Sequence, residues 1–227
     1  MLPVLVWGWM LLSQTYRVSA QEYLYELGGR LGVSHYMGDA ARRGFIAPYA
    51  SALSLLGRRN INFRWAWVAE LGYRGLRGDT RYADNVFPEG HTARFSAHLV
   101  NLRLGSEFNF LPLSDKYRYL GTSSFSPYVG AGIGGSLVWR DRVAVPTLGV
   151  YLAVGAKYKL NARLSLGAEW QWQYTWSDRL DALNPEQTWL SNPYGLNASW
   201  VKGRDAFAVF SLGLTYQLRQ RKQGQCD

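Results

Sequence analysis

Glutamate, arginine and lysine side chains recur at alternate positions in stretches of the chain that otherwise carry apolar residues and glycine. If these stretches are neighbouring strands, charges of both signs share one face and should pair, because an unpaired buried charge is costly. The alternative chemistry is a path for protons or ions. We favour pairing, which predicts a polar plug made of Glu26, Arg30, Arg64, Glu70, Arg103, Glu107, Lys157 and Glu169, with Arg74, Lys159 and Arg163 on the same face.

Enzymatic chemistry has little support, since the chain has only three histidines. His98 and Ser96 could act as the base and the nucleophile of a barrel lipase or deacylase. Because they lie two residues apart on one stretch, both side chains point to the face that we assign to lipid. We therefore expect no catalytic residues and a protein that is not an enzyme.

Metal and cofactor chemistry is also poorly supported. Cys226 is the single cysteine, which excludes an internal disulfide and a metal site built from cysteines. No glycine-rich loop between a strand and a helix is available to hold phosphate. The sequence thus predicts no metal, no cofactor and no small-molecule substrate.

The elements that position the charges are strands with a period of two. Eight stretches alternate in this way, and each approaches the roughly 9–11 residues of a tilted transmembrane strand. The second is the least clear, because Leu55 and Leu56 blur its phase. The stretches occupy residues 23–36, 49–56, 63–74, 100–110, 128–137, 148–160, 164–176 and 208–218.

The apolar faces of these stretches are large and aromatic, in a chain with 10 Trp and 15 Tyr. The interior of an eight-stranded barrel is just wide enough for side chains to fill, so bulky Trp faces belong outside, against lipid. This predicts an all-β fold, an eight-stranded antiparallel transmembrane β-barrel of the OmpA-like type in the outer membrane, which is too narrow for a freely conducting pore. The alternative is a soluble β-sandwich or lipocalin-like barrel.

Residues 1–20 are predicted to be a cleaved signal peptide, because the apolar run 2–12 is followed by the small-residue site Val18-Ser19-Ala20. Residues 21–218 then form the barrel and residues 219–227 a basic periplasmic tail. The formal net charge of +9 can indicate nucleic-acid binding. Since an exported chain has little access to nucleic acid, we assign the charge to lipid headgroups, the lumen or a partner.

The connections predict an orientation. Residues 58–61 and 161–162 are short, whereas 75–93 and 177–204 are long and polar. Short periplasmic turns and long extracellular loops are typical of outer-membrane barrels, so both termini are expected in the periplasm. Residues 111–122 are an exception, because they are long for a periplasmic turn.

The segment 25–39 ends in a Tyr-x-Gly-Asp corner formed by Tyr36, Gly38 and Asp39. It resembles the start of the PorG-like outer-membrane barrels of Bacteroidetes, and the match continues loosely through residues 64–72 and 127–132. The resemblance implies a non-enzymatic component of the type IX secretion system that tethers a periplasmic ring of the PorK–PorN type to the outer membrane. A second hypothesis is an OmpA-like structural or adhesive barrel that works through its extracellular loops.

A periplasmic partner would meet the long turn and the tail. The topology therefore identifies candidate residues for binding a partner. For any one of them, contact with lipid headgroups and solvent is an equally good interpretation. They are Asp115, Lys116, Tyr117, Arg118 and Tyr119 in the turn, and Arg219, Arg221 and Lys222 in the tail.

Overall fold

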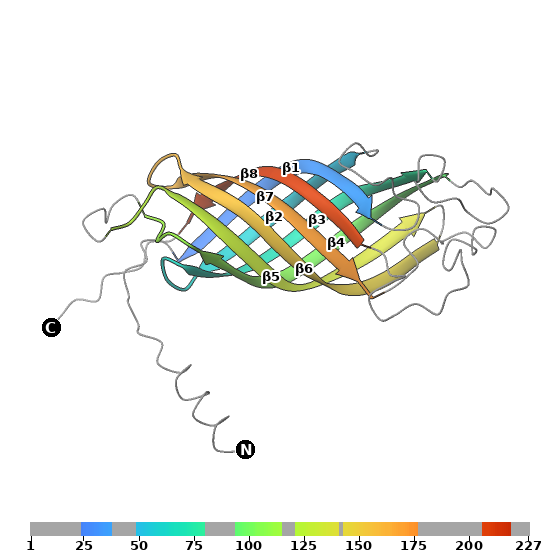
Figure 1. Ribbon diagram of the computed structural model, residues 1–227, viewed down its shortest axis with the longest axis horizontal. Coiled ribbons are helices and arrows are strands. Elements are labelled where there is room, and N and C mark those ends of the chain that lie inside the picture. Colours follow the sequence, from blue (N-terminus) through green and yellow to red (C-terminus); the bar gives the residue numbers. More distant parts are fainter. Residues whose placement is uncertain are drawn as a thin grey trace, which may run out of the picture.

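The computed structural model describes residues 24–37, 49–79, 94–114, 121–140, 143–176 and 206–218. The expected signal peptide and basic tail lie outside these residues. Eight antiparallel strands close into a barrel, which confirms the predicted fold class (Figure 1). The strands are β1 (Tyr25–Met37), β2 (Ala50–Asn60), β3 (Trp65–Asp79), β4 (Arg94–Asn109), β5 (Phe125–Arg140), β6 (Val143–Lys159), β7 (Leu164–Thr175) and β8 (Ala206–Gln217).

Each strand pairs with the strands before and after it in the chain, and β1 pairs with β8 to close the barrel. The closing register runs from Glu26 opposite Gln217 to Met37 opposite Ala206. No helix in the described part of the chain is long and apolar enough to cross a membrane.

The two faces of the wall differ as the alternation predicts. Large apolar side chains on the outer face are exposed, for example Leu31 at 68% and Trp67 at 57%. Side chains of the opposite phase are buried, including Glu26 and Arg30 of β1. An exposed apolar belt around a polar interior is the arrangement of a barrel that is solvated by lipid.

The prediction for β2 was wrong in extent. The strand continues beyond Leu56 to Asn60, with Leu55 outside and Leu56 inside, so the turn lies at residues 61–64 rather than 58–61. The Asn62 side chain closes this turn by accepting hydrogen bonds from the backbone N–H groups of Arg64 (2.8 Å) and Trp65 (2.7 Å). An asparagine that bonds the backbone two residues on is typical of tight turns.

The connections fall at two ends of the barrel (Figure 1). We call one the turn end; its described residues outside the strands are 61–64, 110–114, 121–124 and 160–163, together with Leu24 and Leu218. At the other, the loop end, β1, β3, β5 and β7 end and β2, β4, β6 and β8 begin; the sequence between these strands is 38–49, 80–93, 141–142 and 176–205. The connection between β4 and β5 is thus long for the turn end, as predicted, and the one between β5 and β6 is unexpectedly short for the loop end.

Candidate functional site in the barrel lumen

Seven of the eight residues predicted to form the polar plug are buried inside the barrel. The exception is Arg64, for which the prediction was wrong; it was also wrong for Arg163, which is exposed in the turn 160–163 rather than on the lumen face. β3 begins at Trp65, so Arg64 belongs to the turn and its side chain is exposed. The seven are Glu26, Arg30, Glu70, Arg103, Glu107, Lys157 and Glu169.

Four of these side chains form a ring of ion pairs in the middle of the lumen. Arg30 pairs with Glu70 (3.0 Å) and with Glu169 (2.5 Å). Arg103 lies 2.6 Å from each of the same two carboxylates. Because the four residues belong to β1, β3, β4 and β7, the ring ties strands together across the barrel as well as between neighbours.

A second cluster lies nearer the turn end. Arg58 pairs with Glu26 (2.5 Å) and with Glu107 (2.8 Å), and Lys157 adds a further contact to Glu107 at 2.5 Å. Asn60 donates a hydrogen bond to Glu26 at 2.7 Å. The cluster again joins strands that are not neighbours, since β4 and β6 both contribute to it.

Neutral polar side chains extend the network toward the loop end. The guanidinium of Arg74 pairs with Glu70 (3.1 Å) and donates to the side-chain oxygens of Asn101 and Gln171. Asn101 in turn donates to Gln173 (3.0 Å) and Ser136 (2.9 Å). Most of these buried polar groups therefore have hydrogen-bond partners among themselves. Burial of a polar group without such a partner would be costly.

Beyond the polar side chains, the loop end of the lumen is apolar, which was not predicted. Five large side chains of the inward phase are at most 1% exposed, and Arg74 lies over the Phe207 ring at 5.7 Å. The lumen is therefore filled by ion pairs toward one end and by hydrocarbon toward the other. The five are Tyr36, Leu76, Leu99, Val138 and Phe207.

Glycines make room for the largest lumen side chains. Gly155 lies opposite Tyr128, and the Tyr128 ring occupies the space that a Cβ atom at Gly155 would need. Gly213 lies opposite Arg30 in the same way. The Tyr128 hydroxyl can thereby reach Glu169, to which it donates a hydrogen bond of 2.7 Å.

Arg58 is the central residue that the sequence reasoning missed. The error follows from ending the second stretch at Leu56, which left Arg58 in a turn. The alternation Ser54, Leu56, Arg58, Asn60 continues without a break and carries the signal that could have placed it in the lumen.

In the part of the chain that the structure describes, the other residues considered for catalysis or metal binding do not assemble into a second site. Ser96 and His98 are both exposed on the outer face, and His98 Nδ1 lies 2.7 Å from the Tyr73 hydroxyl. Among the described residues, no group of three or more His, Cys, Asp or Glu side chains is placed to hold a metal ion.

The candidate partner contacts at residues 115–119, and Arg219, Arg221 and Lys222, lie outside the described residues. The base of the long turn is described. Ser114 N–H donates to Ser123 O (3.0 Å), and Ser123 N–H donates to Pro112 O (2.9 Å). Leu113 N–H also reaches Phe63 O at 3.4 Å, which ties the long turn to the neighbouring turn 61–64.

Closed topology, a lipid-facing apolar belt and a polar interior define the class: this is an eight-stranded β-barrel protein of the outer membrane. Its residues 5–226 match the family described as Domain of unknown function (DUF6089), and the chain belongs to that family.

Solved structures with the same fold include Neisserial surface protein A (NspA), at 11% identity and a TM-score of 0.51, covering 86% of this chain and 97% of that one. The outer membrane protein OprG from Pseudomonas aeruginosa is similar at 14% identity and a TM-score of 0.50, covering 89% of this chain and 99% of that one. No curated protein matches the chain significantly.

Proposed function

We propose that this protein is a non-enzymatic membrane anchor that holds a protein-secretion complex at its turn end. The filled lumen is the main support for the proposal, because ion pairs and the five large side chains at the loop end occupy the space through which a solute would pass. We call these five side chains the apolar tier. A barrel of this kind acts through its ends or its outer wall. By the usual asymmetry of outer-membrane barrels, we assign the turn end, where Leu24 and Leu218 lie, to the periplasmic side.

The long turn 110–124 is the feature of the turn end that suits a partner. Its two limbs bond to each other and to the adjacent turn, which makes a fixed base for the residues between them. Together with the resemblance of the first strand to PorG-like barrels, this supports assignment to the type IX secretion system. The partner is then a periplasmic ring of the PorK–PorN type.

Affinity purification of the tagged full-length protein from outer membranes tests this assignment. Recovery of periplasmic ring proteins is expected, and charge reversal by Lys116→Glu with Arg118→Glu should reduce it. Arg163→Glu is the matched control, because it reverses an exposed charge in another turn at the same end. If the ring proteins are absent from the wild-type eluate, or if type IX cargo reaches the surface normally without the barrel, the assignment fails.

A structural or adhesive role at the loop end is the second candidate. Three of the four connections at that end span many residues, namely 38–49, 80–93 and 176–205. Deletion of residues 177–204 would then abolish surface binding and leave secretion intact. The turn-end assignment predicts that this deletion changes neither property and that Lys116→Glu with Arg118→Glu impairs secretion, so these two strains separate the candidates.

An enzymatic role on lipid is not part of the proposal. His98 contacts Tyr73 on the outer wall, and its ring stacks on the Tyr73 ring with centroids 5.8 Å apart. We expect His98→Ala to leave the lipid profile of the outer membrane unchanged. An altered acylation pattern in that strain would contradict the non-enzymatic proposal.

A further inference from the structure

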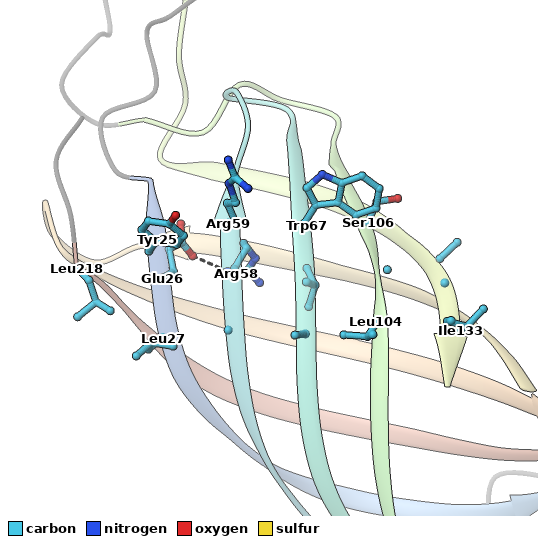
Figure 2. Close-up of a pocket in the computed structure, with 16 residues that line it drawn as sticks. Tyr25, Glu26, Leu27, Arg58, Arg59, Trp67, Leu104, Ser106, Ile133 and Leu218 are labelled. Atoms are coloured by element: carbon cyan, nitrogen blue, oxygen red, sulfur yellow. Dashed lines mark hydrogen bonds and ion pairs between the residues drawn. The ribbon is translucent and has the colours of Figure 1, made fainter. Parts of the chain in front are cut away.

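A groove of about 740 Å³ lies on the outer wall of the barrel near the turn end (Figure 2). This volume is within the range of small-molecule sites. Most of its lining side chains are of the outward phase of β1 to β5, so the groove opens toward lipid. The Glu26–Arg58 ion pair lies on the lumen side of the same wall.

Strand register explains why the wall is hollow here. Leu27, Gly57, Ala69, Leu104 and Ile133 are successive partners across five strands. The neighbouring row toward the turn end continues through Trp67, Ser106 and Ala131. The small residues Gly57, Ala69, Ser106 and Ala131 therefore leave a depression, which is flanked by the larger residues of the same two rows.

On β2, β3 and β4, the next row away from the turn end is bulky again, whereas the same row holds Gly29 on β1 and Gly135 on β5. Leu55, Leu71 and Leu102 are partners across β2, β3 and β4, and each is at least 50% exposed. They limit the groove on the side that faces the middle of the bilayer. The groove is thus a local feature of the wall at the depth where the strands approach the headgroups.

A cation lies at the headgroup side of the groove. Arg59 is exposed next to the end of β2, is flanked in register by Tyr25 and Trp67, and extends toward the turn end in Figure 2. Tyr and Trp are the residues that barrels place at the membrane interface. Among the residues that the structure describes, no carboxylate pairs with Arg59.

We propose that the groove binds one phospholipid of the leaflet at the turn end. Its acyl chain lies over Gly57 and Ala69, and its phosphate pairs with Arg59. Charge complementarity selects this occupant. The apolar groove matches the acyl chain of an anionic lipid, and the arginine at headgroup depth matches its phosphate. A transmembrane segment of another protein would match the groove and would leave Arg59 unused.

Native mass spectrometry of the full-length protein with added phosphatidylglycerol tests the proposal. The wild type is expected to retain one lipid per barrel after release from detergent. Arg59→Gln should lower the retained fraction about fivefold, the equivalent of one basic residue near an anionic membrane surface. Ala69→Leu should lower it as well, because the added side chain fills the groove.

Each substitution has a matched control on the far side of the barrel. Ala168→Leu adds the same side chain to an outward position of β7, and Arg163→Gln removes an exposed cation from the turn between β6 and β7. Heat-dependent migration on gels tests whether each variant is folded. Arg59→Gln changes only a surface side chain, so it keeps the proposal testable if Ala69→Leu does not fold.

Selective loss of lipid from the Arg59→Gln and Ala69→Leu proteins supports the proposal. Equal retention of lipid by the wild type and the four variants overturns the proposal, because the retained lipid is then part of a general annulus around the barrel. Stronger retention of lipid A than of phosphatidylglycerol also overturns it, since lipid A belongs to the other leaflet. A wild-type dimer that the Ala69→Leu substitution abolishes would overturn it as well, because a second barrel would then occupy the groove. This experiment does not measure binding of the periplasmic ring proteins, so a negative result leaves the proposed anchor role intact.

Discussion

Glu70 and Arg103 face each other directly across β3 and β4, with 2.6 Å between Glu70 Oε2 and an Arg103 guanidinium nitrogen. Both residues are at most 2% exposed. The same carboxylate also pairs with Arg30 of β1 and with Arg74, which lies four residues further along β3. Glu70 is therefore the point at which three cations from three strands are compensated.

Glu70→Gln should strongly destabilise the barrel, because it leaves Arg74 buried without its carboxylate partner. Loss of one member of a buried pair costs roughly 3–5 kcal/mol. Urea unfolding of the protein folded into phospholipid vesicles measures the change. The double variant Glu70→Gln with Arg74→Met should recover part of the loss, since the orphaned charge is removed too. Unfolding of Glu70→Gln at the wild-type urea concentration would show that the ion pairs contribute nothing.

Gly134→Ala should destabilise the protein through Gln173. The Gln173 side-chain amide occupies the position of the new Cβ atom, and this amide also accepts a hydrogen bond from Asn101. We expect a loss of about 1–3 kcal/mol, as for other overpacked interiors. Combination with Gln173→Ala should be less destabilising than the sum of the two single changes.

Gly135→Ala is the control for this experiment. It faces outward, and its added Cβ would meet only the Leu148 side chain at an ordinary distance of 3.5 Å. Its urea midpoint should stay close to that of the wild type. Additive effects of Gly134→Ala and Gln173→Ala would contradict the predicted contact.

An arginine on the outer face should be costly in proportion to its depth. Leu31 lies at the middle of β1 and Tyr25 at its turn-end terminus. We expect Leu31→Arg to cost roughly 2–4 kcal/mol and Tyr25→Arg about 0–1 kcal/mol, as found for barrels in bilayers. Reversible folding into vesicles measures both. Equal costs at the two positions would show that the membrane does not lie across the middle of the strands.

The reconstituted protein should show no steady ion current in planar bilayers, because the lumen is occupied at every level from Lys157 to Phe207. A wide porin in the same bilayers is the positive control. Replacement of both Arg30 and Arg103 by Ala should raise the leak, since it removes both cations of the central ring. A steady conductance of the wild type would refute the filled lumen.

Alternation in the sequence predicted the strand number, the lipid-facing side and seven of the eight proposed plug residues, because a period of two is a local property of a strand. Arg64 and Arg58 were misassigned for one reason. Strand ends are set by hydrogen bonds of the turn, here those of the Asn62 side chain, and the hydrophobic pattern does not record them.

The pairing partners within the lumen could not be predicted. The contact of Arg30 with Glu169 joins residues 139 positions apart in the sequence, and it depends on the stagger of all eight strands. The apolar tier was missed for a different reason. Leu76, Leu99 and Phe207 occupy inward positions near strand ends, where an apolar residue in the polar phase resembles a break in the pattern.

Closure of β1 on β8 restricts how any partner can recognise this protein. In an open sheet, the edge strand offers backbone N–H and C=O groups to which an extended peptide can add as a further strand. Here the register between β1 and β8 uses those groups, and Leu218 N–H donates to Tyr25 O at 2.9 Å beyond its end. A partner therefore cannot add a strand to this sheet. The side chains of the connections and of the outer wall have to determine which partner binds.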